Sequence, residues 1–215
     1  MLAGTALVVL VVAATAQAGG GREQVKVKLT PFGQASAKAV LMTKGDLGTG
    51  SGWTGGATKP DLANTLQCPG FHPKQSDLVL IGAAEVKYKH QGLQFDNEVE
   101  IMKTARMVRL DWERTVHSNK FLPCIRRLFA SSLGAKGKLV SVDPLAMPPI
   151  TRNTIAFRVR FDTGKPITHL LIDMLFFGKG RTEVSLATTT TVSAAAVVGK
   201  AELVLARRLA RRIRA

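Results

Sequence analysis

This chain has few of the residues that build metal and catalytic sites. Its 215 residues include two cysteines, four histidines and one tyrosine. No C-x-x-C, H-x-x-x-H or G-x-S-x-G sequence occurs, so the local signatures of zinc sites and of serine hydrolases are absent. We therefore predict no metal, no cofactor and no catalytic residues, and we expect a protein that is not an enzyme.

Three short motifs have a functional interpretation that local structure explains more simply. Asp162-Thr163-Gly164 matches aspartic proteases, but those enzymes need two copies, and Asp and Gly are common turn residues. The glycine-rich segment 48–52 lacks the spacing of a phosphate-binding loop, which favours an ordinary flexible loop. His72 follows Cys68 by four residues and completes a metal site with Cys124 only if both thiols are reduced.

The amino-terminal residues predict export from the cytoplasm. An apolar run covers residues 2–14, and Ala16-Gln17-Ala18 follows as a small-x-small cleavage site. No lysine or arginine precedes the run, so an uncleaved anchor and a buried core segment are the alternatives. We predict a signal peptide at 1–18, a flexible segment at 19–33 and a single α+β domain at 34–215, located outside the cytoplasm.

The two cysteines are expected to form a disulfide. Cys68 and Cys124 are an isolated pair in a chain predicted to reach an oxidising compartment. Closing a loop of this size is worth roughly 4 kcal/mol in the chain-entropy description. Two free buried thiols are the alternative.

Basic charge is concentrated in two segments of a chain whose net charge is +15. Residues 103–138 carry nine lysines and arginines against two acidic residues, and residues 196–215 carry six against one. Such faces favour polyanions, so the expected partner is an anionic envelope polymer or a phospholipid surface. A solvated surface without a partner is the alternative, and specific nucleic-acid binding is not predicted. The candidate contact residues are Arg207, Arg208, Arg211, Arg212 and Arg214.

Hydrophobic periodicity predicts the order helix, two strands, two helices, four strands, helix. Helices are expected at 36–41, within 104–133 and at 194–213, with 118–119 and Pro123 dividing the long middle region. Strands are expected at 84–89, 95–101, 139–142, 155–161, 167–177 and 182–190. Hairpin-length connections imply antiparallel pairing, so the predicted fold class is α+β, an antiparallel sheet covered by helices.

Several short sequences resemble secreted proteins and lipoproteins of actinobacteria. They are Gly45-Asp46-Leu47 to Gly52-Trp53, Cys68-Pro69-Gly70-Phe71, Ser76-Asp77-Leu78 and the strand 180–184. The element order is similar to the PsbP-like α/β/α sandwich, which LpqN-type lipoproteins and extracytoplasmic sensor domains of receptor kinases share. The resemblance implies a fold and a compartment, and hardly an activity. The chain lacks the lipidated cysteine of the lipoproteins.

Trp53 is the candidate ligand contact, because a rigid aromatic side chain beside a glycine-rich loop can stack on a partner. The alternative is that Trp53 fills the edge of the sheet. The leading functional hypothesis is a non-enzymatic binding or sensing domain at the cell envelope, which holds a small apolar or anionic ligand between sheet and helices. A structural envelope protein that uses basic helices and a hydrolase of unrecognised type are the alternatives. The sequence predicts no oligomeric state.

Overall fold

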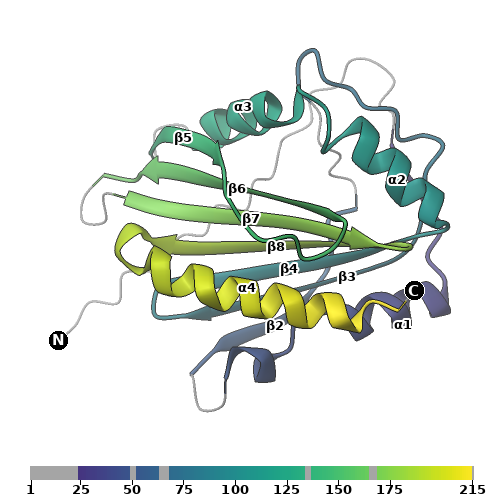
Figure 1. Ribbon diagram of the computed structural model, residues 1–215, viewed down its shortest axis with the longest axis horizontal. Helices are drawn as coiled ribbons and strands as arrows, with labels where there is room; N and C mark the ends of the chain where they lie inside the picture. The colour runs from purple at the N-terminus through teal and green to yellow at the C-terminus, as the bar shows by residue number, and fades with distance from the viewer. Residues whose placement is uncertain (1–23, 49–51, 63–67, 134–136, 165–168, 215) are drawn as a thin grey trace.

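One eight-stranded sheet with helices on both faces makes up the fold of the computed structural model (Figure 1). The structure describes residues 24–48, 52–62, 68–133, 137–164 and 169–214. The strands are ordered β1-β3-β4-β8-β7-β6-β5, and β2 also pairs with β3. Their bounds are β1 Lys26–Val27, β2 Thr54–Thr58, β3 Val79–His90, β4 Leu93–Met102, β5 Lys138–Pro144, β6 Asn153–Asp162, β7 His169–Lys179 and β8 Thr182–Thr191.

All strand pairs except β1 with β3 are antiparallel, and this confirms the predicted α+β class. Gln91 and Gly92 form the two-residue turn between β3 and β4, with φ of 44° and 80°. Positive φ at both positions matches the twist of a tight hairpin, and glycine takes this conformation without a steric penalty. The local turn therefore fixes the register of the two longest neighbouring strands.

Four α-helices cover the sheet: α1 Pro31–Val40, α2 Ala105–Arg114, α3 Phe121–Leu133 and α4 Ala195–Arg212. Thr30 and Thr104 cap α1 and α2, because each threonine side chain accepts a hydrogen bond from the backbone three residues on. Residues 115–120 separate α2 from α3, as predicted. Pro123 lies in the first turn of α3, where a missing N–H costs nothing, and so does not itself break the helix.

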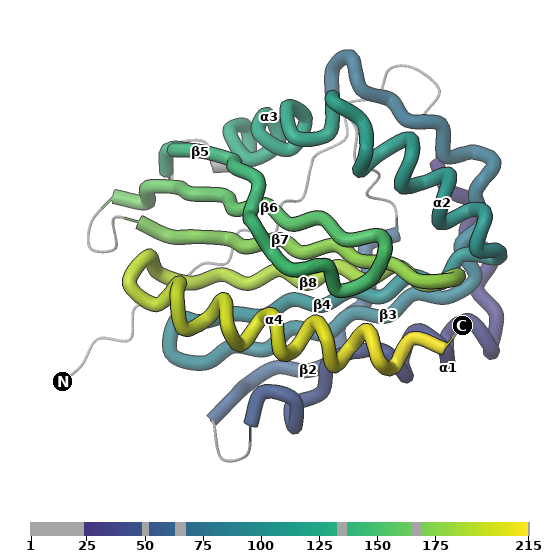
Figure 2. Tube along the Cα trace, in the orientation of Figure 1, coloured from purple at the N-terminus to yellow at the C-terminus, as the bar shows by residue number. Residues whose placement is uncertain are grey.

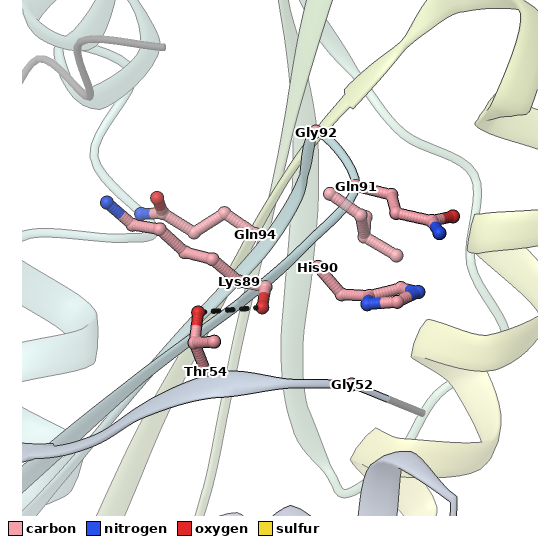
Figure 3. Close-up of a pocket in the computed structure, with 8 residues that line it drawn as sticks. Gly52, Thr54, Lys89, His90, Gln91, Gly92 and Gln94 are labelled. Carbon is pink, nitrogen blue, oxygen red and sulfur yellow. Dashed lines mark hydrogen bonds between the residues drawn. The ribbon is translucent and has the colours of Figure 1, made fainter. Parts of the chain in front are cut away.

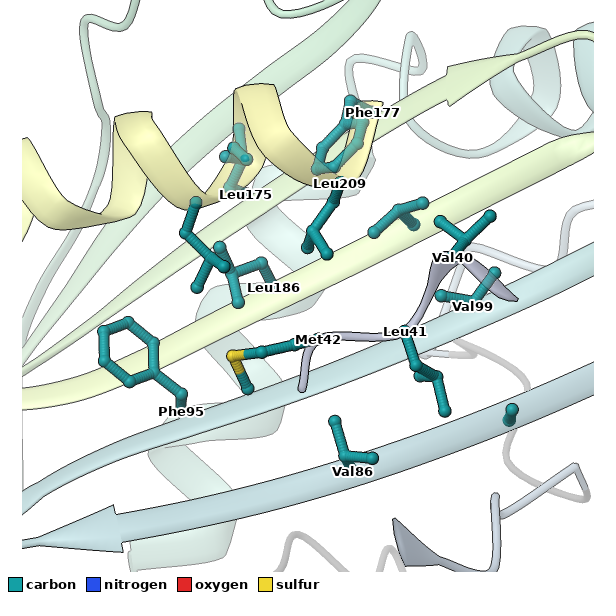
Figure 4. Packing of buried hydrophobic residues seen from close by; sticks show 14 of the residues in the cluster. Val40, Leu41, Met42, Val86, Phe95, Val99, Leu175, Phe177, Leu186 and Leu209 are labelled. Carbon is teal, nitrogen blue, oxygen red and sulfur yellow. The ribbon is translucent and has the colours of Figure 1, made fainter. Parts of the chain in front are cut away.

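The first face of the sheet is packed against α1 and α4. Inward-facing residues of β3, β4, β7 and β8 form one continuous apolar cluster with both helices. Leu209 of α4 is completely buried and lies over Leu186 and Phe177 (Figure 4). The buried Asn97 accepts a hydrogen bond from the Met42 backbone at 2.8 Å, and so ties the end of α1 to this core. We call this side of the sheet the closed face.

The second face carries α2 and α3, whose paths lie apart from α4 (Figure 2). Its apolar residues form two clusters instead of one. Trp112 and Val108 of α2 pack on Leu80 and Met102, while Phe121 and Ile125 of α3 pack on residues of β5, β6 and β7 such as Phe157. We call this side the divided face.

A disulfide attaches the segment before β3 to α3. Cys68 and Cys124 are bonded, with their Cα atoms 5.5 Å apart, which confirms the predicted pair. Both cysteines are buried, together with Phe71 and the neighbouring Leu128. The bond closes a sequence separation of 56 residues and holds α3 against the rest of the chain.

The amino-terminal boundaries differ from those expected. The predicted signal peptide at 1–18 lies outside the described residues. Within the predicted flexible segment 19–33, the structure places β1 and the first turn of α1. Backbone bonds from Lys26 to Leu78 and from Lys28 to Leu80, of 3.0 and 2.8 Å, order this part. The prediction of flexibility for residues 24–33 was therefore wrong, because pairing with β3 supplies partners that are distant in sequence.

Candidate functional site

A cavity of about 340 Å³ lies on the divided face, between the sheet and helices α2 and α3. Residues of β4, β7 and β8 form its floor, and α2 and α3 form its walls. Asp61 lines it and is exposed, so the cavity meets solvent on that side. We call it the α2/α3 cavity.

The strands bring three glutamates to its floor. Side chains alternate between the two faces of a strand, so Val99 and Val184 enter the closed-face core while their neighbours point the other way. Glu98 and Glu100 of β4 and Glu183 of β8 line the cavity. Glu100 is the direct cross-strand partner of Glu183. Like charges in such pairs destabilise a sheet, so this arrangement has an energetic cost.

Helix α2 contributes a fourth carboxyl group. Asp111 and Trp112 both line the cavity, and Asp111 accepts a 2.5 Å hydrogen bond from the Gln75 amide. Burial raises the pKa of Asp111, and the bond from Gln75 offsets part of that rise. The side chain is thus held in place but is not paired with a positive charge inside the cavity.

Glu98, Glu100 and Glu183 have raised pKa values because they are buried close together. Burial, with the charge of Glu85, raises the pKa of Glu98 to about 7. Burial, with the charges of Glu98 and Asp111, raises that of Glu100 to about 8. The pKa of Glu183 is raised well above its ordinary value by burial and by the charges of Asp111 and Glu100.

Glu183 also lacks hydrogen bonds of good geometry. Both of its carboxylate oxygens are buried, and neither has such a partner among the described residues. No lysine or arginine is among the described residues that line the cavity. Within the same part of the chain, no group of three or more His, Cys, Asp or Glu side chains is arranged to hold a metal ion.

The remaining wall is apolar and partly aromatic. Phe121 and Ile125 come from α3, Met174 and Phe176 from β7, and Trp112 from α2. The edge of the Phe121 ring meets Phe176, with the ring centroids 6.3 Å apart. Cavities of this volume with apolar walls and a few polar groups are typical of small-molecule sites. The described lining contains no histidine or cysteine.

Trp53, the predicted ligand contact, is not exposed. Its exposed fraction is 6%, and its ring contacts His90 and Phe95, with centroid distances of 5.4 and 5.6 Å. This burial matches the alternative interpretation, in which Trp53 fills the edge of the sheet, because Trp53 directly precedes β2 and folds onto the closed-face core.

A second pocket of about 330 Å³ lies next to Trp53, at the turn between β3 and β4 (Figure 3). Gly52 and Thr54 form one side, and residues 89–94 form the other. Thr54 donates a 3.3 Å hydrogen bond to the Lys89 carbonyl across it. Leu93 is the one large apolar residue of this lining, so the pocket lacks the apolar wall of the α2/α3 cavity.

The five candidate arginines divide into two groups. Arg208 and Arg212 turn back onto the protein and contact the Asp46 carboxylate, at 3.2 and 2.6 Å. Arg212 also donates a 2.7 Å hydrogen bond to the Leu41 carbonyl. Arg207, Arg211 and Arg214 are exposed. Two of the five predicted contact residues therefore form ion pairs within the protein.

The Asp162-Thr163-Gly164 motif begins a turn, as its alternative interpretation predicted. The Gly164 backbone donates a 2.9 Å hydrogen bond to the Asp162 carboxylate, and Gly164 has a φ of 73°. Residues 49–51 of the glycine-rich segment lie outside the described residues. Cys68 and Cys124 are bonded to each other, so the alternative metal site with His72 is not formed.

Sequence reasoning did not identify the four buried carboxyl groups of the cavity, Glu98, Glu100, Asp111 and Glu183. In the predicted strand 95–101, Glu98 and Glu100 alternate with apolar residues, a pattern that by itself indicates a solvent-facing side. The available signal was that the two helices within 104–133 also need a sheet face to cover. Acidic residues on the strand face opposite the first core are then buried beneath the second helical layer.

No protein-family model matches the chain, and no curated protein matches it. Among solved structures, its fold is similar to the extracellular domain of PknH from Mycobacterium tuberculosis. The identity is 11%, the TM-score is 0.48, and the match covers 86% of this chain and 97% of that one. A likeness of this size establishes neither a shared family nor a shared function, so membership of the PsbP-like family stays a prediction.

None of the helices in the described parts of the chain is long and apolar enough to cross a membrane.

Proposed function

We propose that this protein is an exported, non-enzymatic binding protein that holds a small, partly apolar molecule in the α2/α3 cavity. The observation that carries the proposal is the cavity itself, which combines the aromatic residues Trp112, Phe121 and Phe176 with a group of buried carboxyl groups and no basic residue among its described lining. An apolar wall favours binding by burial, and a few polar groups at one side orient the ligand. The Cys68–Cys124 disulfide supports the extracytoplasmic location, because such bonds persist in oxidising compartments.

Trp112 allows the proposal to be tested by fluorescence. The chain has two tryptophans, so Trp53→Phe leaves Trp112 as the one reporter, and this residue lines the cavity. The probes are 2-phenylethylamine, 2-phenylethanol and 3-phenylpropionate, which share a phenyl group and differ in charge. We expect saturable quenching or a spectral shift with at least one probe.

A cavity-filling variant supplies the control. Ser185→Phe fills the floor of the cavity, while Ala187→Phe adds the same ring two residues along the same face of β8, outside the lining. In the Trp53→Phe background, Ser185→Phe should weaken binding at least about tenfold and Ala187→Phe should leave it close to the parent value. The proposal is wrong if no probe binds saturably, or if Ser185→Phe binds as well as the parent.

A second candidate function is attachment to an anionic surface through the outer side of α4. Lys200, Arg207 and Arg211 are exposed, and they follow one another at helical spacing with Val197 and Val204. The two valines are 75% and 56% exposed. A basic stripe with apolar side chains between the charges is typical of helices that lie on anionic membranes.

Replacement of Arg207, Arg211 and Arg214 by glutamine tests this function on vesicles of phosphatidylglycerol and phosphatidylcholine. We expect binding at low salt to fall at least about tenfold, because each basic residue near such a surface contributes about 1 kcal/mol. Arg208→Gln is the control with an unchanged outer stripe. Equal binding by the wild type and the triple variant at low salt would show that the stripe only solubilises the protein.

A further inference from the structure

We infer that the ligand of the α2/α3 cavity is an organic cation, an ammonium group carried on an apolar body. The inference rests on the proposed function above and names the chemical class of its ligand. It comes from the distribution of charge, from unpaired oxygen atoms and from the position of the aromatic wall.

The distribution of charge is opposite to that of the whole chain. The protein has 30 lysines and arginines against 15 acidic residues, yet the described lining contains acidic residues and no basic one. Glu100 and Glu183 face each other across the β4–β8 pair, and Asp111 lies over them from α2. Mutual repulsion disfavours this cluster unless protons or a cation neutralise it.

Glu183 supplies an independent observation that points to a ligand. Glu183 lines the cavity, and its two carboxylate oxygens are buried without a hydrogen bond of good geometry in the described chain, although the Trp112 indole and the Asp111 carboxyl both act on it. A buried carboxylate that is poorly satisfied is costly, and native folds rarely keep one without a reason. An ammonium group carries up to three N–H donors and a positive charge, and no described side chain of the lining supplies such a charge.

The aromatic wall favours an organic cation over a metal ion. Trp112 and Phe176 line the cavity, and the ring of Phe176 stacks on Phe157 with one of its two faces. Cations are attracted to aromatic ring faces within about 6 Å. Phe121, Ile125 and Met174 extend this wall with surface that a hydrated metal ion cannot use. A primary amine with an aromatic or branched aliphatic body matches both halves of the lining.

Cation binding should be coupled to proton release. Glu98 and Glu100 have pKa values of about 7 and about 8, so both are largely protonated in the empty protein at mildly acidic pH. A bound ammonium stabilises the ionised forms and lowers these pKa values, so protons leave as the ligand enters. Affinity should therefore rise between pH 6 and pH 8.

Other charged groups around the cluster do not reverse the expected rise of affinity with pH. Asp61 at the mouth and Glu85 on β3 add negative charge near Glu98. Lys87 is the nearest base on β3, and it forms a 3.0 Å ion pair with Glu85. On α2, Arg114 acts on Asp111 through its charge only, because it forms a bidentate pair with Asp77.

The test compares 2-phenylethylamine with its neutral isostere 2-phenylethanol in the Trp53→Phe protein. At pH 8 we expect the amine to bind at least about tenfold more tightly, and the preference to shrink toward unity near pH 5.5 as the carboxyl groups take up protons. The amine itself stays protonated through this range, as a lysine does. Calorimetry in two buffers of different ionisation enthalpy should show proton release at pH 7.

Glutamine substitutions assign the preference to the cavity. Glu100→Gln with Glu183→Gln should remove most of the tenfold preference while 2-phenylethanol still binds. Glu113→Gln is the matched control, because Glu113 is exposed on α2, outside the cavity lining. Circular dichroism and urea unfolding of each variant confirm that a lost preference is not lost structure.

The outcomes separate the inference from the proposed function. If 2-phenylethanol binds as tightly as the amine, or if the double glutamine variant keeps the preference, the cation inference is wrong and the binding function stands. If neither probe binds differently in the parent and in Ser185→Phe, the cavity is not a ligand site and both proposals fail.

Discussion

Each face of the sheet is covered by two helices and buries apolar side chains, but the two faces differ in how continuous their apolar cores are. On the closed face, α1 and α4 complete one continuous apolar cluster. On the divided face, α2 and α3 complete two separate clusters, and the α2/α3 cavity is lined by residues of both. The difference shows that covering a sheet with two helices does not by itself produce a filled core.

Buried carboxyl groups on the two faces also differ in whether a basic residue neutralises them. On the closed face, Arg158 forms a bidentate pair with the buried Asp173, with distances of 2.6 and 2.5 Å. Glu202 of α4 is buried beside them without a hydrogen bond of good geometry among the described residues, and burial with the charge of Asp173 raises its pKa to about 7. On the divided face, a whole group of carboxyls lacks a base in the described lining. The closed face thus contains one buried carboxyl group with a raised pKa, while the divided face contains a cluster of them.

The largest expected effect comes from the disulfide that holds α3. Replacing Cys68 and Cys124 together by serine should lower the free energy of unfolding by roughly 4 kcal/mol, because a loop of 56 residues is no longer closed. Urea unfolding of the oxidised wild type and the double variant measures this. If α3 is held mainly by its apolar contacts, the loss will be under about 1 kcal/mol.

Truncations on the two faces should differ in cost. Leu209→Ala on the closed face removes a completely buried side chain and should cost about 3 kcal/mol. Met174→Ala on the divided face enlarges a cavity that already exists, so about 1 kcal/mol is expected. Equal costs in urea unfolding would mean that the divided face is as well packed as the closed one.

The acidic floor should make stability depend on pH. Folded-state pKa values of about 7 and about 8 lie above those of the unfolded chain, so the folded state binds more protons and loses stability as pH rises from about 5 to 8. Each such group contributes up to about 1.4 kcal/mol per pH unit. Glu100→Gln with Glu183→Gln should gain about 2 kcal/mol at pH 8 and little at pH 5, as thermal or urea unfolding at both values can show. A gain that is the same at both pH values contradicts the assignment to titration.

The contribution of Asp46 to folding stability should depend on pH in the opposite direction and should be smaller. Burial alone raises its pKa, but hydrogen bonds from Arg212, Thr43 and Arg208 outweigh burial and lower the pKa to about 2. The stabilisation is therefore present above about pH 4 and is lost as pH falls toward 2. Asp46→Asn should cost about 1 to 2 kcal/mol at pH 7 and nothing near pH 2. Asp143→Asn, at an exposed position of β5, is a control expected to change little.

The order of elements from α1 to α4, apart from β2, was predictable because the hydrophobic period of each segment indicates which of its residues are buried. The alternation in 95–101 and 155–161 gave strands β4 and β6, and the stripe of Leu205 and Leu209 gave α4. Strands β1 and β2 were missed because they are short, polar or glycine-rich, and are defined only by pairing with β3.

The site was not predictable for a related reason. Nothing near Glu183 in the sequence shows that Glu100 lies opposite, since register belongs to the pairing of β4 with β8. In the same way, Asp46 and Arg212 are 166 positions apart, so the inward turn of two arginines could not be anticipated. Composition predicted that the helix is basic, and only the fold divides its arginines into paired and free groups.

The contact between Asp46 and Arg212 joins the two ends of the domain, so it can form only after the carboxy-terminal helix has been synthesised. Leu41 and Met42 belong to the same closed-face cluster as Leu205 and Leu209 of α4. That helix is synthesised about 160 residues later, as the separation of 166 positions between the two ends of the ion pair shows. Until then the cluster lacks this helix, and the loop that must close is long, which slows folding and exposes apolar surface meanwhile. The closed-face core is therefore complete only when the carboxy-terminal helix is present.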